Sequence, residues 1–466
     1  MTRKRLDAFY LLLLGCAAFL LFGVVMALAS PSSMLDFKVI YYGARSAAHH
    51  GDPYARGEIL SRYIADGGTL PGGAVQSRIA RDVLSMCIYP PTALLFMVPL
   101  SFLNYGPAHI LWLALLLMSF IVASIMAWDL AADFDPMLAA VLGAVLAANN
   151  VIAVGVGNSA VLVVAFCVIP VWCFVRKRFI WAGVLLLAVA IGTKPHDAIW
   201  VWLVLLLAGG TLRRRALQSV VVLAAFAVPA VLWIGSIAPH WRHELGANVS
   251  ALGAPGGLSD PSLAAKGERA VSMVISLQAV FSAFIDNPHL YNLLSYLVCA
   301  PLFILWAWTT LRSGRSAHKL WLSFAALMPI AMLPIYHRPY DAKLLLLAVP
   351  AAVIFFRYGG RVGKAAFWLN FAAIVLTADL PWMGLQLLVN RIHPASSGVA
   401  AHIWTAVWVY PVPLALLAAG TLNLWIYREH CSGRMLCDRA SESRPAAPDE
   451  GFGQAKFETP VSPQYR

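Results

Sequence analysis

The chain has 466 residues, of which 60% are hydrophobic and only 12% are charged. This composition excludes an ordinary soluble globular domain, in which about 25% of the residues are charged. The formal net charge of +12 would suit a nucleic-acid partner, but the basic residues stand in short clusters between long apolar runs, so we expect none. The sequence therefore predicts an all-α polytopic membrane protein.

The first predicted element is an apolar run over residues 8–29, which is long enough to cross a bilayer. It follows a basic N-terminus and lacks a good small-residue cleavage site, so we interpret it as a retained signal anchor. Further basic clusters lie at 2–5, 176–178, 213–215, 312–319, 357–364 and from 428 onward. They predict cytoplasmic termini in the plasma (inner) membrane, with the opposite face toward the periplasm or cell exterior.

Residues 30–87 then form the first outer loop, and Asp36 lies at its start. Over residues 37–49 the apolar side chains share one helical face, whereas Lys38, Arg45 and His49 share another, which predicts an amphipathic helix on the membrane surface. A charged group at this boundary suits a catalytic base. Ser33 and Asp36 also have the spacing of a capping box, so a purely structural interpretation stays open.

Apolar runs continue along the chain and predict about twelve membrane helices within residues 1–430. We interpret 88–128 as one broken descending unit and 137–153 as the ascent, whereas a separate crossing helix over 88–103 would upset the parity. Under this topology Asp133-Phe134-Asp135 is an acidic cytoplasmic loop, and we predict no metal site. Residues 431–466 have few large aliphatic side chains and are predicted to be a disordered cytoplasmic tail.

Polar residues of the outer turns are the candidates for a functional site, because ionisable groups inside membranes tend to mark function. They are Asp36, Tyr41, Arg45, Tyr89, Asn158, Lys194, His196, His337, Arg338, Tyr340 and Asp341. Structural alternatives exist for several of them. Lys194 could snorkel to the interface, Asn158 could cap a helix, and His337 with Arg338 could form a solvated turn. Their convergence on one face favours a site.

The motifs at these turns resemble those of glycosyltransferase family 87, the polyprenyl-phosphate-mannose-dependent mannosyltransferases and their relatives. The first-loop motif runs from Asp36-Phe37 through Tyr41-Tyr42 and Ala44-Arg45 to Gly51-Asp52-Pro53-Tyr54. Tyr89-Pro90-Pro91 and the segment 337–341 follow in the family's order. Gly157-Asn158 and Lys194-Pro195-His196 stand where the family often has Gly-Gln and Lys-Pro-Gln. The resemblance spans residues 11–349.

The resemblance implies a GT-C fold with an active site on the outer face and no cofactor. The donor would be a polyprenyl-phosphate-linked sugar, namely mannose or another hexose, or arabinose. The acceptor would be a glycan or a glycolipid. Asp36 would act as the general base, and Lys194 with Arg338 or His337 would stabilise the leaving phosphate. The remaining candidates would bind the donor's phosphate and sugar.

Two other functions stay open at this level. A polytopic transporter or flippase would predict internal repeats, and the sequence shows no convincing repeat. An O-antigen ligase or polymerase would carry its large loop late in the chain, and the long segment 233–273 keeps that alternative open.

Overall fold

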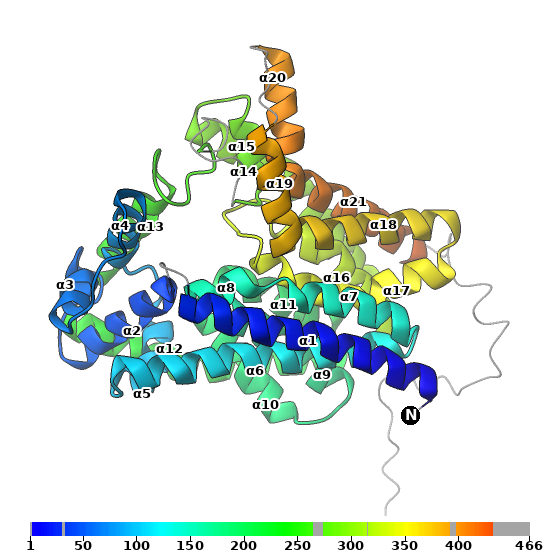
Figure 1. Ribbon diagram of the computed structural model, residues 1–466. Coiled ribbons are helices and arrows are strands. Elements are labelled where there is room, and N and C mark those ends of the chain that lie inside the picture. The colour runs from blue at the N-terminus through cyan, green and yellow to red at the C-terminus, as the bar shows by residue number, and fades with distance from the viewer. Residues whose placement is uncertain (1, 30–32, 264–273, 315, 392–397, 432–466) are drawn as a thin grey trace, which may run out of the picture.

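The computed structural model describes residues 2–29, 33–263, 274–314, 316–391 and 398–431. Within these ranges the regular elements are all helices, which confirms the all-α prediction (Figure 1). The predicted tail lies outside the described residues after Cys431, and so does the 264–273 part of the long late segment.

The helices of the bundle follow one another in chain order, with the first loop between α1 and α5 and the long segment with α13 (Trp241–Gly253) between α12 and α14. They are α1 (Arg3–Ala29), α5 (Pro91–Ser101), α6 (Tyr105–Ala132), α7 (Pro136–Ala148), α8 (Val151–Val156), α9 (Ala160–Val175), α10 (Ile180–Thr193), α11 (Pro195–Ala208), α12 (Gly210–Ile237), α14 (Leu277–Ser282), α15 (Pro288–Arg312), α16 (Ala317–Ala331), η1 (Asp341–Ala348), α17 (Val349–Tyr358), α18 (Gly360–Leu376), α19 (Asp379–Arg391), α20 (Val399–Trp404), η2 (Thr405–Val409) and α21 (Pro411–Cys431).

Among the described residues, five helices are long and apolar enough to cross a membrane. They are α1, α6, the α7–α8 pair, α12 and α15. The number rises to seven if the bent pairs, α18 with α19 and α20–η2 with α21, each count as one span. The count of about twelve stays a prediction, because α9, α10 and α11 have only 14 to 16 residues each.

One end of the bundle, which we call the basic end, is held by ion pairs between helix termini. Asp129 near the end of α6 lies 3.0 Å from Arg5 and 2.8 Å from Arg176. Asp133 lies 3.0 Å from Arg176, and Asp135 pairs with Arg357. The chain's N-terminus lies at this end, on the right of Figure 1, whereas α2 to α5 lie on the left. The basic clusters therefore gather opposite the first loop, as the sequence predicts.

The Asp133-Phe134-Asp135 segment has structural roles at the basic end. Besides these ion pairs, Asp135 caps α7 by accepting hydrogen bonds of 3.0 and 3.1 Å from the backbone N–H groups of Met137 and Leu138. Both carboxylates therefore have protein partners, and they lie at the opposite end of the bundle from Asp36. The segment is the acidic helix connection that the sequence indicates.

Contacts of α5 and α6 show how residues 88–158 run along the bundle. The Thr92 hydroxyl donates to the carbonyl of Gly192 at one end of α5, and the carbonyl of Leu103 beyond its other end accepts from the Tyr41 hydroxyl at 2.8 Å. Both contacts lie away from the basic end, so both ends of α5 lie at the opposite end of the bundle. The helix α6 then descends to Asp129, and α7–α8 returns. Within residues 88–158, α6 and the α7–α8 pair therefore run along the bundle in opposite directions, and α6 alone corresponds to the descending unit expected over 88–128.

The first loop folds into α2 (Leu35–Ala48), α3 (Glu58–Ala65) and α4 (Ala74–Leu84). The predicted amphipathic helix is therefore present, but the capping box is wrong: the N-cap of α2 is Met34, which has a φ of 57° and makes no side-chain cap hydrogen bond. Most of α2 is buried, because α3, α4 and α5 pack around it. The residues of its polar face are less covered: Lys38 and Arg45 are partly exposed, and His49 at its end is exposed.

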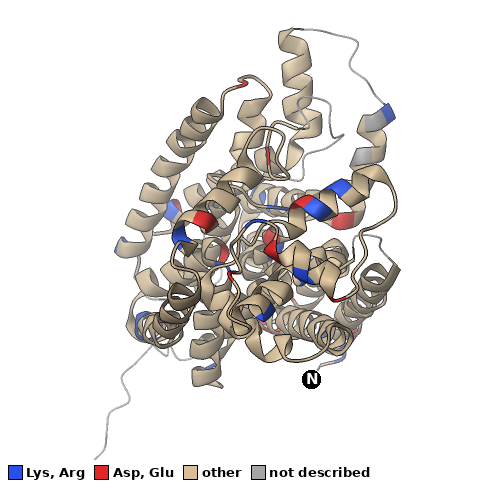
Figure 2. Cartoon of the chain, turned by 90° about the vertical axis from the view of Figure 1, so that its left-hand side faces the viewer, with Lys and Arg blue, Asp and Glu red and all other residues tan. Residues whose placement is uncertain are grey.

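A further helix, α13 (Trp241–Gly253), packs against this loop. Nδ2 of Asn248 donates to the carbonyls of Tyr54 and Cys87 at 3.0 and 3.1 Å. Most of the ribbon in Figure 2, which views this end of the molecule, is free of charged residues. The charges that it does carry lie mainly on the short helices and turns near the middle of the view.

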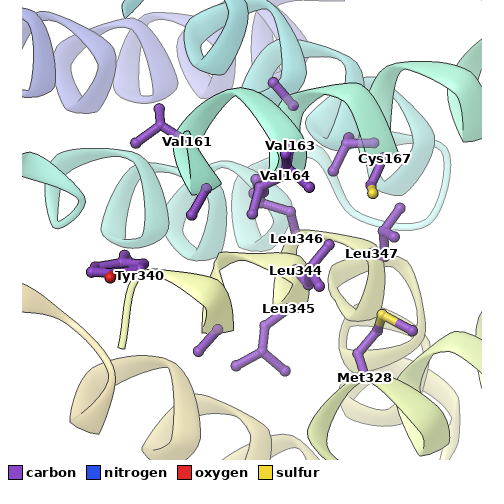
Figure 3. Close-up of a cluster of buried hydrophobic side chains, with 14 of the residues drawn as sticks. Val161, Val163, Val164, Cys167, Met328, Tyr340, Leu344, Leu345, Leu346 and Leu347 are labelled. Atoms are coloured by element: carbon purple, nitrogen blue, oxygen red, sulfur yellow. The ribbon is translucent and has the colours of Figure 1, made fainter. Parts of the chain in front are cut away.

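The core next to the site is built around η1. All eight of its residues are buried, and Leu344 to Leu347 pack beside the Val161–Cys167 stretch of α9 (Figure 3). Its Lys343 is 0% exposed and donates from Nζ to the carbonyl of Thr377 at 2.7 Å. A rigid, fully buried η1 fixes Tyr340 and Asp341 at the start of this helix.

Cysteine labelling tests the orientation of the bundle. In a chain without its accessible native cysteines, Asp52→Cys and His289→Cys should react with an impermeant maleimide in intact cells. Arg214→Cys, which is exposed at the basic end, should react only after the cells are opened, because basic clusters stay on the cytoplasmic side. If only Arg214→Cys were labelled in intact cells, the orientation would be the opposite of the predicted one.

Candidate active site

Asp36 lies in the first turn of α2, beside the loop that joins α8 to α9. Its Oδ2 accepts a hydrogen bond of 2.6 Å from Nδ2 of Asn158, which also lies within 3.1 Å of the Tyr340 hydroxyl oxygen. Oδ1 of Asn158 accepts from the backbone N–H of Ala160 at 2.8 Å. Asn158 therefore accepts from the first backbone N–H of α9, whose N-cap residue is Ser159, and also holds Asp36 close to Tyr340.

Gly157 makes this close approach possible. Its φ of +70° is a conformation that side-chain-bearing residues rarely adopt. A Cβ here would lie 2.6 Å from Sδ of Met34 and 2.8 Å from Cβ of Phe37. The carbonyl of Gly157 also accepts a 3.0 Å hydrogen bond from the Trp112 indole. The glycine thus lets the α8–α9 loop pack directly on the start of α2.

Replacement of Gly157 tests this packing. Gly157→Ala should lower the free energy of unfolding by about 1–3 kcal/mol, because it combines backbone strain with a clash. The thermal unfolding midpoint of the detergent-solubilised protein measures the loss. Gly246→Ala on α13 is the matched control, because a Cβ there has no heavy atom within 4 Å. Equal midpoints for the two variants would show that the loop is not tightly packed.

A buried charged network joins the α10–α11 turn to the segment before η1. Nζ of Lys194 lies 2.9 Å from Oδ2 of Asp197 and also pairs with Asp341. Oδ2 of Asp341 accepts a 2.7 Å hydrogen bond from the backbone N–H of Arg338. The Lys194 side chain is only 14% exposed and lies between two carboxylates, so it does not snorkel to the interface.

Local sequence explains how this network forms. Pro195 occupies the first position of α11, where its missing N–H costs nothing. Lys194 therefore ends one helix as the next begins. Residues three apart at a helix start lie on one face, which brings Lys194 and Asp197 together.

Two histidines approach Asp197 from different segments. Nε2 of His337 lies 3.3 Å from Oδ1 of Asp197, and Nε2 of His196 lies 3.9 Å from the same oxygen. The two imidazole rings meet edge to face with centroids 5.4 Å apart. His337 is only 1% exposed, so the alternative of a solvated turn at this position is wrong.

Ring and electrostatic contacts connect this network to Asp36. Nζ of Lys194 lies 5.4 Å from the centroid of the Tyr340 ring. The Arg338 guanidinium donates to the Tyr336 hydroxyl and, with Lys194, interacts electrostatically with the Asp36 carboxylate. The structure therefore gathers nine of the eleven predicted residues at the end opposite the basic end. They are Asp36, Tyr89, Asn158, Lys194, His196, His337, Arg338, Tyr340 and Asp341.

Tyr41 and Arg45 have other contacts. The Tyr41 hydroxyl donates to the Leu103 carbonyl and accepts a 2.7 Å hydrogen bond from Arg45. Arg45 also lies 3.6 Å from Asp66. These contacts anchor the middle of α2 to the α5–α6 connection and to the end of α3, away from the Asn158 side of Asp36.

Three residues that are not among the predicted site residues complete the cluster. Asp197 is the hub of the buried network, Tyr336 binds Arg338, and Ser159 shares a side-chain hydrogen bond with Tyr89. Asp197 had a recognisable signal, since an acidic residue three positions after Lys194 at a proline-started helix faces the same side. The other two had none beyond their position at an outer turn.

Burial raises the pKa of the Asp36 carboxyl above its ordinary value, whereas Arg338, Asn158 and Lys194 each act to lower it. The net shift is upward. A carboxylate with a raised pKa is a stronger base than one in water. The environment of Asp36 is therefore suited to accepting a proton.

Fold and site together define a polytopic membrane protein with a buried cluster of ionisable residues at one end of its helices, which is a typical substrate site. The chain belongs to glycosyltransferase family 87, because a family model of that description matches residues 88–335. The protein is therefore a membrane glycosyltransferase. The matched segment includes Tyr89, Asn158 and Lys194, whereas Asp36 precedes it and Asp341 follows it. No curated protein and no solved structure matches the chain.

Proposed function

We propose that the protein transfers a hexose such as mannose, or arabinose, from a polyprenyl-phosphate-linked donor to a glycan or glycolipid acceptor. The reaction takes place on the periplasmic or exterior face of the plasma membrane, within a GT-C fold. The observation that carries this proposal is the placement of Asp36 beside buried cations at the end of the bundle that lies opposite the basic clusters.

About twelve crossings would connect the two ends. This count results if α9, α10, α11, α16, the η1–α17 unit and α18 each cross once, in addition to the longer helices and α21. The contacts at the two ends support the alternation. Asp129, Arg176 and Arg357 meet at the basic end, whereas Asn158, Lys194 and Tyr340 meet at the other.

Asp36 acts as the general base in this mechanism. It accepts the proton of the acceptor hydroxyl while that oxygen attacks the anomeric carbon of the donor sugar. Asn158 holds the carboxylate by its 2.6 Å hydrogen bond and keeps it aligned. The new glycosidic C–O bond forms as the bond between the anomeric carbon and the phosphate oxygen breaks, and the bonding electron pair leaves with the polyprenyl phosphate.

Lys194, with Arg338 and His337, compensates the charge that develops on the leaving phosphate. Such compensation is strong where water is excluded, and these three side chains are buried or largely so. Tyr89, His196, Tyr340 and Asp341 line the donor's phosphate and sugar in this proposal. Tyr41 and Arg45 contribute by holding α2, which carries the base.

Helix lengths favour a lipid-borne donor. At about 1.5 Å per residue, the 14-residue helices α10 and α11 are about 21 Å long. A hydrocarbon core is about 30 Å thick. The turn at Lys194 then lies below the outer surface of the bilayer, at a depth that a polyprenyl-linked phosphate reaches and a water-soluble sugar nucleotide does not.

The raised pKa of Asp36 predicts the acid limb of the pH–rate profile. Transfer needs the ionised carboxylate, so kcat/KM should fall as the pH drops through the pKa of Asp36. Because burial raises that pKa, the fall should begin at a higher pH than for an ordinary aspartate, whose pKa is about 3.9. An initial-rate profile that stays flat down to pH 4 would contradict this role.

A donor panel tests the proposed function. The purified full chain, reconstituted in vesicles, is incubated with radiolabelled polyprenyl-phosphate mannose, glucose or arabinose and with a lipid extract as acceptor. We expect label in a new glycan or glycolipid from at least one donor. Movement of the intact donor between leaflets without a new glycosidic bond would indicate a flippase instead.

A further inference from the structure

The strongest unassigned feature is the group formed by His196, Asp197 and His337. One ring nitrogen of each histidine and a carboxylate oxygen lie within 4.8 Å of one another. Asp197 is 0% exposed and His337 is 1% exposed. Nε2 of His196 is shielded from solvent and has no hydrogen-bond partner. Two imidazoles and one carboxylate are the ligands of many catalytic metal sites.

The tautomer of His337 also favours a metal ion at this cluster. Its Nδ1 lies 3.1 Å from the carbonyl oxygen of Ile335 in hydrogen-bonding geometry, and a carbonyl can only accept, so Nδ1 carries the proton. In a neutral imidazole Nε2 then holds a lone pair, and that lone pair faces Oδ1 of Asp197 at 3.3 Å. Two acceptors at this distance need a cation between them. Metal-binding histidines usually donate their other N–H to a carbonyl in this way.

The distances favour an ion over a single proton. A proton on His337 would satisfy one contact and leave the His196 nitrogen unpaired at 3.9 Å from the same oxygen. Ligand atoms about 2.1 Å from a tetrahedral ion lie about 3.4 Å from one another. The observed separations of 3.3 and 3.9 Å bracket this value. Oδ2 of Asp197 stays with Lys194 at 2.9 Å, which leaves Oδ1 for the ion.

The charge balance of the cluster also accommodates a divalent cation. With neutral histidines, the carboxylates of Asp36, Asp197 and Asp341 outnumber the cations Lys194 and Arg338 by one. A donor phosphodiester would add a further negative charge to this buried site. A divalent ion changes the balance to one positive charge, which the phosphodiester neutralises. Buried charges without such compensation are strongly unfavourable.

We infer that His196, Asp197 and His337 bind a divalent transition-metal ion, with Zn²⁺ the best match to two imidazoles and one carboxylate. This inference replaces our expectation from the sequence that the protein has no metal site. These three residues supply three ligands, which leaves a fourth tetrahedral position for another group. If the proposed function holds, the donor phosphate occupies this position, and His337 acts on the phosphate through the ion.

Metal content tests the inference without depending on activity. The full chain in detergent is stripped with a chelator, reloaded with Zn²⁺ or Co²⁺ and freed of excess ion. Elemental mass spectrometry should find one ion per chain, and bound Co²⁺ should show the intense visible absorption of a tetrahedral site. His196→Ala, which alters the most exposed ligand, should weaken binding at least 10-fold. His196→Ala/His337→Ala should abolish it.

Controls keep the outcomes distinct. His289→Ala removes an exposed histidine on α15 and should bind the ion like the unaltered chain, and the unfolding midpoint of each variant shows whether it is folded. If the unaltered chain holds no more ion than the double variant, the inference is overturned, and the proposed function stands if transfer proceeds. One bound ion without transfer from any donor would support the metal site and contradict the proposed function.

Discussion

Asp36→Asn should lower the transfer rate by about 10²–10⁴-fold, because the amide keeps the shape of the side chain and removes its basicity. The folded protein should remain. Since burial raises the pKa of Asp36, the folded state binds the proton more tightly than the unfolded state does. The protonated Asp36 therefore stabilises the folded protein at low pH, and this contribution to the free energy of unfolding is lost as the pH rises through the pKa of Asp36 in the folded state. Near neutral pH a neutral amide should leave the unfolding midpoint unchanged or raise it.

A matched control separates catalysis from a general effect of charge loss. Asp82→Asn changes an aspartate on α4 that lies in an exposed ion pair with Arg78, and it should transfer sugar at the normal rate. Rates are compared at equal protein levels in vesicles. Transfer by Asp36→Asn within a few-fold of the unaltered chain would remove the general base from the mechanism.

Lys194→Ala should reduce transfer by 10²-fold or more, whereas Lys194→Arg should keep part of the activity, because the leaving phosphate needs a nearby positive charge. The alanine variant also leaves Asp197 and Asp341 without their shared partner. Breaking a buried ion pair in this way costs about 3–5 kcal/mol of stability, so its unfolding midpoint should fall as well.

A double variant distinguishes catalysis from charge balance. Lys194→Ala/Asp341→Asn removes one charge of each sign, so it should recover much of the stability that the single variant loses. The leaving phosphate would still lack its cation, and transfer should stay low. Recovery of normal transfer in the double variant would mean that Lys194 only neutralises its carboxylate neighbours.

Much of the site could be predicted because the positions of the basic clusters indicate how the helices alternate between the two ends of the bundle. The basic clusters mark one end of the helices, so polar residues at the alternate turns must meet at the other end. Asp36, Asn158, Lys194 and Tyr340 meet there for this reason. The all-helical class followed from the composition and the long continuous apolar runs, because backbone groups inside a bilayer must be satisfied within helices or closed barrels, and barrel strands alternate apolar and polar residues.

The other features of the fold and site could not be predicted, because they depend on side-chain packing, which a hydropathy pattern does not show. The periodicity of α2 predicts a helix, but only the folded chain shows that α3, α4 and α5 pack around it and bury most of its residues. Tyr41 and Arg45 lie five and nine positions after Asp36, and at about 100° per residue Tyr41 turns away from the Asn158 side. The left-handed conformation of Met34 cannot be read from a Ser–Asp spacing. The short helices α10 and α11 likewise leave the crossing count open.

The stoichiometry of the reaction tests the account most directly. The purified chain in vesicles is given polyprenyl-phosphate mannose with label in both the sugar and the phosphate, and both products are quantified over time. We predict one free polyprenyl phosphate for each new glycosidic bond, with both products nearly absent for Asp36→Asn. Label that moves across the bilayer as intact donor, or products formed equally well by Asp36→Asn, would contradict a glycosyl transfer that depends on this carboxylate.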